Sequence, residues 1–212
     1  MIYDITQPIS ESMKVYSGDP TVSIEALSDV SAGAPYSLSK ISMGSHTGTH
    51  VDAPSHLMSG GNTMDNIALD TLVGPCTVVN CDTDMDISIQ DLERMKLPSD
   101  TKRLLVRTRR SAGYLSREAA ANLVEAGVIL VGIDSSSVDA PASQDLAVHQ
   151  TLLRAETVII ENLALDSIEP GNYWLVCLPL RLQGCDGAPA RAILMDSAPQ
   201  ATPITSGEVS HD

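Results

Sequence analysis

The chain has 212 residues, of which 43% are hydrophobic and 19% are charged, and its formal net charge is −14 at pH 7. This composition supports one compact core and excludes an intrinsically disordered protein. The acidic excess argues against nucleic acid and anionic membranes as partners, since their phosphates would be repelled.

Short runs rich in valine and isoleucine recur between turn signals and predict many strands with few helices. The expected strands are Ile2–Thr6, Val22–Leu27, Tyr36–Met43, Val73–Asn80, Leu104–Thr108, Val128–Ile133, Thr157–Ile160, Tyr173–Leu178 and Ala190–Met195. The alternating segment Tyr36–Met43 is expected to be half-exposed. The unbroken apolar run that begins at Val128 is typical of a central strand.

Two helices are predicted from their capping residues. Ser88 begins a segment that runs to about Lys96, and Ser116 caps a second helix over Arg117–Ala126. The second helix leads directly into the strand at Val128, which is typical of an α/β connection.

Neither an internal repeat nor a linker interrupts the chain, so we expect a single α/β domain of mixed sheets over residues 1–198. A flexible tail is expected over residues 199–212. We expect no membrane span, because no run of about 18 apolar residues is present. The N-terminus does not resemble a signal peptide, which favours a cytoplasmic protein. The cysteines lack zinc or redox spacing and are expected to be reduced and structural, at Cys76, Cys81, Cys177 and Cys185.

Three of the five histidines lie within eleven residues and enclose an aspartate. The residues are His46, His50, Asp52 and His56. Gly48 and Pro54 argue against a regular helix in this segment, and a straight strand would hold the imidazoles too far apart. A kinked strand or a tight loop would bring His46, His50 and Asp52 to one centre.

Imidazole and carboxylate ligands without thiolates suit zinc, manganese or a similar divalent ion. Three protein ligands leave a position for water, as at catalytic sites, and water bound to such an ion can supply a hydroxide nucleophile. The alternative is a set of ordinary surface or core histidines in a loop rich in glycine and serine.

The carboxylate of Glu161 interrupts the apolar run over residues 158–165. A buried carboxylate is costly unless it is paired, hydrogen-bonded or bound to metal. The residues alone leave a buried ion pair and a metal ligand equally open for Glu161. His149, considered alone, fits a helix histidine better than a ligand.

The segment from His46 to His56 resembles the H-x-G-T-H-x-D-x-P-x-H signature of cyclase-like metal-dependent hydrolases, a family that includes bacterial kynurenine formamidase and isatin hydrolase. Further matches follow in the family's order, at Gly18–Pro20, Gly132–Ser135, His149, Glu161–Leu163 and Asp186–Arg191. The resemblance implies a mixed α/β fold of the swivelling β/α/β type. It also implies assembly as a homodimer or homotetramer.

The resemblance further implies metal ligation by His46, His50 and Asp52. In the formamidase branch, a second ion is held by His149 and Glu161, with Asp52 as the bridge. The isatin branch has one manganese ion and a glutamine in place of the glutamate. Glu161 therefore favours two divalent ions, with zinc expected and manganese as the alternative.

Roles around the metal ligands are less narrowly defined. His56 is the candidate proton shuttle, and the alternatives are a further metal ligand or a partner of the ligands. Tyr16 stands where the family places an aromatic residue against the substrate, with Gly18 and Asp19 in the adjacent turn. A surface tyrosine on an ordinary turn is the alternative.

Three polar residues within the further matches have open roles. Asp134 ends a buried strand, where α/β sheets often place ligand-facing loops, and it equally fits a simple turn. Asp186 and Arg191 would either bind a substrate carboxylate or pair with each other, and a structural role is favoured.

The function implied by the resemblance is a metal-dependent hydrolase acting on a small-molecule amide. The expected reaction is the arylformamidase conversion of N-formylkynurenine to kynurenine and formate by attack of metal hydroxide. The enzymatic alternatives are an isatin-hydrolase-like ring-opening enzyme for cyclic amides or lactones, and a cyclase or dehydratase. The non-enzymatic alternative is a metal-binding module.

Overall fold

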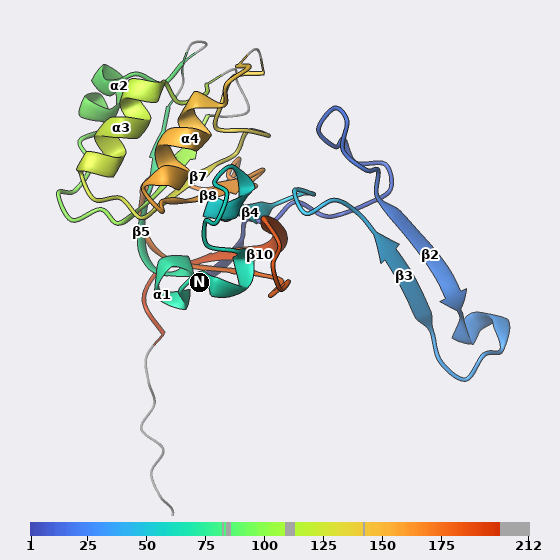
Figure 1. Ribbon diagram of the computed structural model, residues 1–212. Coiled ribbons are helices and arrows are strands. Elements are labelled where there is room, and N and C mark those ends of the chain that lie inside the picture. Colours follow the sequence, from blue (N-terminus) through green and yellow to red (C-terminus); the bar gives the residue numbers. More distant parts are fainter. Residues whose placement is uncertain (82, 84–85, 109–112, 142, 200–212) are drawn as a thin grey trace, which may run out of the picture.

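The computed structural model of the chain describes residues 1–81, 83, 86–108, 113–141 and 143–199, and strands dominate it (Figure 1). The strands are β1 (Ile2–Asp4), β2 (Ser23–Ser28), β3 (Leu38–Ser42), β4 (His50–Asp52), β5 (Val73–Asn80), β6 (Arg103–Arg107), β7 (Leu130–Ile133), β8 (Val158–Glu161), β9 (Gly171–Pro179) and β10 (Gly187–Met195). The helices are α1 (Leu69–Leu72), α2 (Ile89–Met95), α3 (Arg117–Glu125) and α4 (Ala147–Arg154), with short 3₁₀ turns at Val30–Ala32, Pro54–His56 and Met64–Asn66. All nine predicted strands are confirmed to within a few residues.

Eight strands form one mixed sheet in the order β1-β10-β4-β8-β7-β6-β5-β9. Strand β9 also pairs with β10, so seven strands close into a barrel-like ring and β1 lies on its outside edge. The pairings along β5, β6, β7 and β8 are parallel, and the remaining pairings are antiparallel. This architecture confirms the expected mixed α/β class.

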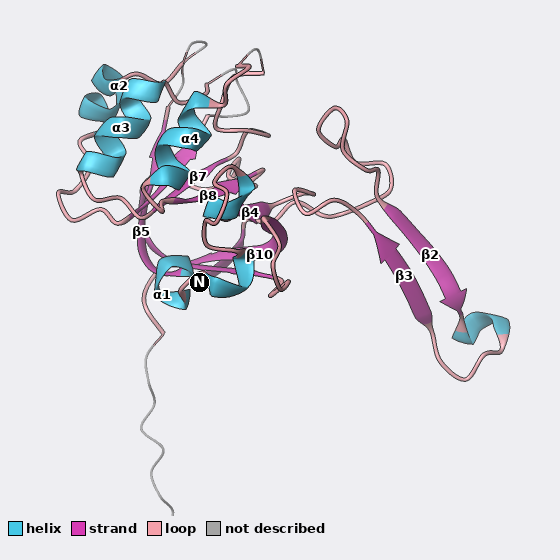
Figure 2. Cartoon of the chain, viewed as in Figure 1, coloured by secondary structure: helices cyan, strands magenta, loops and turns pink. Residues whose placement is uncertain are grey.

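Two hydrophobic cores lie on opposite faces of the parallel strands. In β6, Leu105 belongs to the core inside the ring, whereas Leu104 and Val106 belong to a second core. Leu123 of α3 and Leu152 of α4 contribute to that second core, and α2, α3 and α4 lie together on this side of the sheet (Figure 2). Burial on both faces explains why these strands read as unbroken apolar runs.

Both predicted helices are confirmed together with their caps. The Ser88 hydroxyl accepts a hydrogen bond from the backbone N–H of Asp91, whose carboxylate accepts one from the Ser88 N–H. The Ser116 hydroxyl accepts from the N–H of Ala119. These caps satisfy N–H groups that the first helical turn leaves unpaired.

Strands β2 and β3 form a separate hairpin that projects from the body of the molecule (Figure 1). The expectation of a half-exposed strand at Tyr36–Met43 is wrong, because all five residues of β3 are exposed. Alternation predicts which side chains share a face, but the body of this chain covers neither face of the hairpin.

The sequence also predicted reduced cysteines, the absence of a membrane span and a flexible C-terminal tail. Cys76, Cys81 and Cys177 are buried, Cys185 is half-buried, and no disulfide is found among the described residues. In the part of the chain that the structure describes, no helix is both long and apolar enough to cross a membrane. The predicted tail falls outside the described residues from position 200 onward.

Candidate metal centre

Strand β4 carries the central part of the histidine-rich segment and is completely buried. It pairs with β10 on one side and with β8 on the other. In the second pairing His50 lies opposite Glu161, and Asp52 shares a face of β4 with His50 because strand side chains alternate. The register of β4 and β8 therefore brings together residues more than 100 positions apart in the chain.

The bend expected in this segment occurs before β4. Gly48 has a φ of 66°, which lies in the left-handed region that favours glycine. Its carbonyl oxygen accepts a hydrogen bond from His50 Nδ1 at 2.9 Å, which leaves Nε2 of that imidazole directed at the carboxylates. His46, on the other side of the bend, contacts Asp52 through Nδ1 at 2.7 Å.

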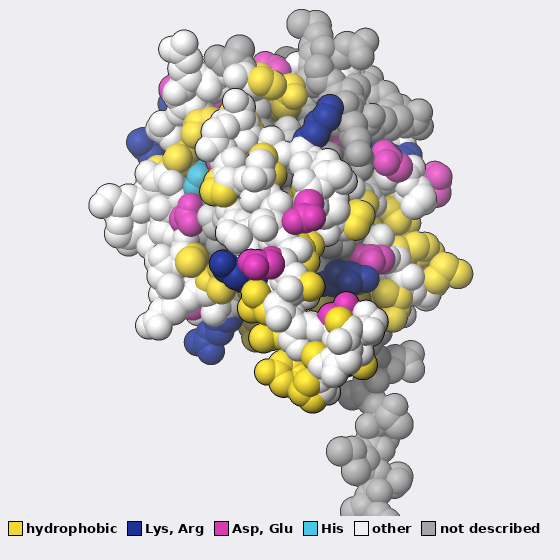
Figure 3. Space-filling view, turned by 90° about the vertical axis from the view of Figure 1, so that its right-hand side faces the viewer, with side chains coloured by type: hydrophobic (Ala, Val, Ile, Leu, Met, Phe, Trp, Pro, Cys, Tyr) yellow, Lys and Arg dark blue, Asp and Glu magenta, His cyan; other side chains and the backbone are white. Residues whose placement is uncertain are grey.

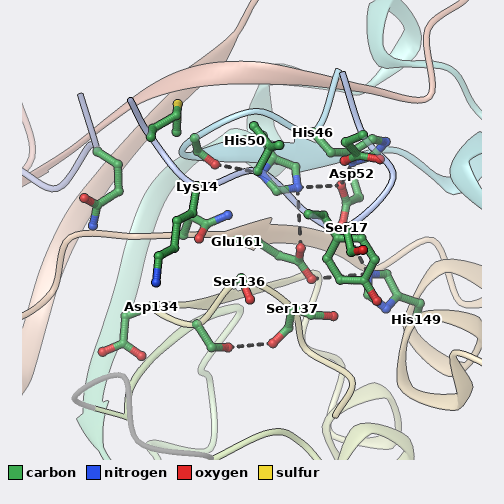
Figure 4. A pocket seen from close by; sticks show the side chains of 18 of the residues that line it. Lys14, Ser17, His46, His50, Asp52, Asp134, Ser136, Ser137, His149 and Glu161 are labelled. Carbon is green, nitrogen blue, oxygen red and sulfur yellow. Dashed lines mark hydrogen bonds and ion pairs between the residues drawn. The ribbon is translucent and has the colours of Figure 1, made fainter. Parts of the chain in front are cut away.

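Four of the side chains predicted as metal ligands converge in Figure 4. His50 Nε2 lies 3.3 Å from Asp52 Oδ1 and 3.4 Å from Glu161 Oε2. His149 Nε2 lies 3.2 Å from Glu161 Oε1 and 3.5 Å from Asp52 Oδ2. Asp52 is thus shared, because each of its oxygens faces a different histidine.

These separations fit the coordination of a cation better than direct pairing. Among the described residues, His50 Nε2 and Asp52 Oδ2 are buried without a hydrogen-bond partner, and such orphaned atoms are rare in proteins. Ligand atoms about 2.0–2.1 Å from a tetrahedral ion lie roughly 3.3 Å apart, close to the observed spacings. Two donor groups could each hold an ion, and both contain Asp52: His46, His50 and Asp52, and Asp52, His149 and Glu161.

His149 is oriented by a carboxylate that the sequence did not single out. Asp139 Oδ2 accepts hydrogen bonds from His149 Nδ1 at 2.7 Å and from the His149 backbone N–H at 2.9 Å. Its Oδ1 accepts from the backbone N–H of Val148 at 3.0 Å. Asp139 thereby fixes the ring so that Nε2 faces Asp52 and Glu161, as carboxylates beside metal-binding histidines do.

A third donor group lies beside the first and contains His56. Asp186 Oδ2 lies 2.9 Å from His46 Nε2 and 3.3 Å from His56 Nδ1. His46, His56 and Asp186 could also hold a cation, so the geometry leaves both alternatives for His56 open. Of the two alternatives for Asp186 and Arg191, pairing with each other is not found, because Arg191 Nη2 contacts Asp4 Oδ2 at 2.5 Å instead.

The electrostatics of the cluster favour bound cations. Burial alone would lower the pKa of His149, but the hydrogen bond with Asp139 and the neighbouring carboxylates of Asp52 and Glu161 raise it to about 12. Burial would raise the pKa of Asp186, but its hydrogen bond with His46 holds it at about 2. The carboxylates therefore outweigh desolvation and stabilise positive charge here, which a divalent metal also supplies.

The cluster opens into a pocket with a volume of about 850 Å³, within the usual range for small-molecule sites. His46, His50, Asp52, His56, His149 and Glu161 all line it. Tyr16, whose side chain is 53% exposed, and Asp19 also line it. Gly18 lies in the turn between them, where the Asp19 N–H donates to the Tyr16 carbonyl, and is outside the lining.

Comparison with known proteins gives the same family as the histidine-rich motif. The family model named Cyclase matches residues 3–140. The chain belongs to the Cyclase family. Family relatives include kynurenine formamidases from Polaromonas naphthalenivorans, 36% identical with coverage of 92% of this chain and 91% of the relative, and from Bacillus cytotoxicus, 32% identical with coverage of 90% and 95%.

Solved structures agree with this membership. A potential metal-dependent hydrolase with cyclase activity superposes with a TM-score of 0.83 at 32% identity, over 94% of this chain and 99% of that one. Isatin hydrolase A from Labrenzia aggregata superposes with a TM-score of 0.81 at 24% identity, over 93% of this chain and 94% of that one. The second comparison shows a shared fold.

Proposed function

We propose that this member of the Cyclase family is a metal-dependent arylformamidase that converts N-formylkynurenine to kynurenine and formate in the cytoplasm. The observation that carries the proposal is the position of Asp52, shared between two groups of metal-type donors in an open pocket. Relatives named kynurenine formamidase, 32–36% identical over at least 90% of this chain, support this reaction over other hydrolyses.

The chain's donors fit two divalent ions, with zinc favoured and manganese as the alternative. His46, His50 and Asp52 would hold one ion, and His149 and Glu161 would hold the other with Asp52. When bound, such ions activate water and polarise the substrate carbonyl. Asp139 and the Gly48 carbonyl oxygen hold His149 and His50 in the orientation that this binding needs.

His56 is placed to move protons at the edge of the cluster. Its side chain is 25% exposed, and its Nδ1 lies 3.3 Å from Asp186 Oδ2. In this role the imidazole takes a proton from the attacking water and passes it to the departing aniline nitrogen. The contact with Asp186 holds the imidazole in place between these two transfers.

The test is hydrolysis by protein reconstituted with zinc or with manganese, measured on N-formylkynurenine, on isatin and on a panel of small lactones. We expect N-formylkynurenine to have the highest kcat/KM of these substrates and a chelator to abolish turnover. A higher kcat/KM for isatin or a lactone would show that the enzyme opens cyclic substrates and is not a formamidase. Stable metal binding without hydrolysis of any of these substrates would instead indicate a metal-binding module.

We also propose that the hairpin of β2 and β3 assembles this chain into a homodimer, or a homotetramer built from such dimers. An isolated two-stranded hairpin is at best marginally stable in water, and this one exposes Ile24, Leu27, Leu38 and Ile41 by 42–58%. Figure 3 shows hydrophobic side chains on the face seen from the hairpin side. Exposed apolar side chains gathered on one hairpin favour contact with a second copy of the chain.

Light scattering after size-exclusion chromatography tests this assembly. Ile24 and Ile41 lie opposite each other in the hairpin, and Ile24→Thr with Ile41→Thr keeps β-branched side chains while removing apolar surface. We expect the double variant to be monomeric at concentrations where the unmodified chain is dimeric or tetrameric. Leu69→Thr, at an exposed position on α1, is the control, and a monomeric unmodified chain would exclude the proposal.

A further inference from the structure

Asn162, which directly follows the metal-type donor Glu161, has a backbone conformation that is uncommon for residues other than glycine. Its φ is 56°, in the left-handed region that asparagine tolerates better than most residues do. The Asn162 N–H donates to the Ser135 carbonyl oxygen at 2.9 Å, and the Asn162 carbonyl oxygen accepts from the Thr49 hydroxyl at 2.6 Å. Hydrogen bonds on both sides therefore hold the backbone in this conformation.

The bend at Asn162 brings its side chain to the same pocket as that of Glu161. Side chains alternate between the two faces along a strand, so an extended continuation of β8 would place residue 162 on the face opposite to Glu161. Instead, Glu161 and Asn162 both line the pocket. Rare backbone conformations cluster at functional sites, and this one adds a second polar side chain from the end of β8 to the pocket.

The carboxamide of Asn162 has no partner within the described part of the chain. No hydrogen bond to this side chain is present there, and neither its Oδ1 nor its Nδ2 is fully buried. The residue is half-buried, and both of its backbone polar groups are already occupied by Ser135 and Thr49. The unpaired donor and acceptor of the side chain are therefore open to a molecule bound in the pocket.

Asn162 lies one position beyond a facing pair of metal-type donors. His50 of β4 is opposite Glu161 of β8, and Figure 4 shows these two side chains in contact within the donor cluster. In this antiparallel pairing, the next position brings Thr49 beside Asn162, which its hydroxyl contacts. Consecutive Cα atoms are about 3.8 Å apart, so the reacting group of a substrate at the cluster lies within reach of the Asn162 side chain.

An N–H donor is the group that the cluster otherwise lacks for a carbonyl substrate. Its ionised carboxylates only accept hydrogen bonds. The Nδ1 atoms of His50 and His149 are already paired, with the Gly48 carbonyl oxygen and with Asp139. Nδ2 of Asn162 is a neutral donor beside these groups, and its hydrogens are not used by the described residues.

We propose that Asn162 is a catalytic residue whose Nδ2 donates a hydrogen bond to the carbonyl oxygen of the scissile formamide. Negative charge develops on this oxygen as water adds to the carbonyl carbon, and it leaves the oxygen when the carbonyl re-forms and the C–N bond breaks. A fixed donor beside such an oxygen stabilises the transition state more than the bound substrate. This inference rests on the proposed function and deepens it, because it names a residue of the chain that binds the reacting carbonyl.

Asn162→Gly removes the side chain without straining the backbone, because glycine adopts a positive φ readily. We expect kcat to fall by about 10- to 100-fold, as when a hydrogen bond to a charged group is lost, with KM changed by less than about threefold. The loss should be the same for N-formylkynurenine and for formanilide, since both contain the formamide. Asn162→Asp retains an oxygen but removes the donor, and its kcat should fall at least as far.

Lys96→Gly is the matched control, since Lys96 has a φ of 50°, is exposed and does not line the pocket. It should behave as the unmodified chain. Thermal melting and metal content per chain show whether each variant is folded and loaded. The inference is overturned by full activity in Asn162→Gly or Asn162→Asp, by a loss confined to N-formylkynurenine, or by a loss that a lower metal content explains.

A binding measurement separates failure of this inference from failure of the proposed function. Formate carries the negative charge that the carbonyl oxygen gains during the reaction, and calorimetry with formate needs no turnover. We expect Asn162→Gly to weaken formate binding about tenfold and to leave aniline binding unchanged. If the unmodified chain hydrolyses no formamide, the proposed reaction is wrong, yet this measurement still decides the donor. Equal formate affinity in the two proteins, or no formate binding by either, would exclude it.

Discussion

Asp52 is the residue common to two of the donor groups of the centre, and each of its oxygens faces an imidazole from a different element. Oδ1 faces His50 on its own strand, and Oδ2 faces His149 from α4. Burial would raise the pKa of Asp52, but the charge of His50 and hydrogen bonds with the surrounding histidines hold it well below its usual value. An ionised carboxylate in this position can join two cations, which neither histidine can do alone.

Substitution of Glu161 by glutamine tests whether the second ion exists. Glu161 Oε1 accepts a hydrogen bond from the Val138 N–H at 2.8 Å, and glutamine retains an oxygen for this bond while losing the negative charge. We expect Glu161→Gln to lower the affinity for the second ion by tenfold or more and to leave the first ion bound. Elemental analysis after dialysis should fall from about two ions per chain to about one.

Glu125→Gln, on the exposed side of α3, is the matched control for charge removal and should retain both ions. An unchanged metal content in Glu161→Gln would make Glu161 a structural residue that only pairs with His50 and His149.

Removal of the His56 imidazole separates proton transfer from metal binding. The His56 ring centroid lies 4.2 Å from that of His46 and 5.8 Å from that of His149, so it borders both donor groups that contain Asp52 without belonging to either. We expect His56→Ala to retain its metal while kcat falls by about 10²–10⁴-fold, the usual contribution of a general acid–base group. Metal content and kcat measured on the same preparation check this, and loss of metal would assign His56 as a ligand.

The helices and strands that the sequence predicted are those whose formation depends on residues close together in the chain. The caps at Ser88 and Ser116 and the apolar runs of the parallel strands depend on neighbours in the sequence, and the structure has all of them. Helix α4 lacks such a signal: its N-cap, Leu146, has a φ of 47° and makes no side-chain cap. The cap comes instead from Asp139, outside the helix.

The contacts that Asp186 and Asp139 make in the centre could not be predicted from the sequence. Asp186 is 140 positions from His46, and only the pairing of β10 with β4 brings them together. Asp139 lies in a loop where carboxylates are common, so its contact with His149 had no periodic or motif signal. The clustered histidines and the apolar surroundings of Glu161 were readable because each is unusual within a short window.

Asp139 links the start of α4 to the metal-type cluster, so its substitution should affect both. Asp139→Asn retains one oxygen for a backbone N–H but loses the charge and the second acceptor. We expect the free energy of unfolding to fall by about 1–2 kcal/mol, the usual effect of a lost cap, and metal affinity to fall by about 10- to 100-fold. Urea denaturation of metal-free protein and calorimetric metal titration measure the two effects separately.

The matched control is Asp145→Asn, which removes a charge close to the start of α4 but makes no contact with His149 in the described residues. It should leave metal affinity unchanged. A stability loss in Asp139→Asn without weaker metal binding would restrict Asp139 to capping.

At the scale of the whole molecule, β10 joins parts of the chain that are distant in sequence. It pairs with β1, β4 and β9, so it closes the ring, holds the N-terminal strand and supports the strand that carries His50 and Asp52. Two ion pairs reinforce the contact with β1: Arg191 with Asp4, and the N-terminal amine of Met1 with Asp196. Both pairs are largely exposed, so the register of β10 depends mainly on its backbone pairing and its buried side chains.

The pair of Asp4 and Arg191 should therefore give a small, acid-sensitive contribution to stability. The hydrogen bond from Arg191 lowers the pKa of Asp4 from its usual value of 3.8, so the folded state binds the proton more weakly than the unfolded state does. The contribution is fully present above about pH 4 and is lost as the pH falls through the lowered pKa. We expect Arg191→Gln to unfold at lower urea concentration than the unmodified chain at pH 7, and the difference between the two midpoints to be smaller at pH 3 than at pH 7. High salt at pH 7 should also narrow the difference, because exposed charges are screened. A difference that persists unchanged at pH 3 would show that the aliphatic part of the Arg191 side chain provides the stability instead of its charge.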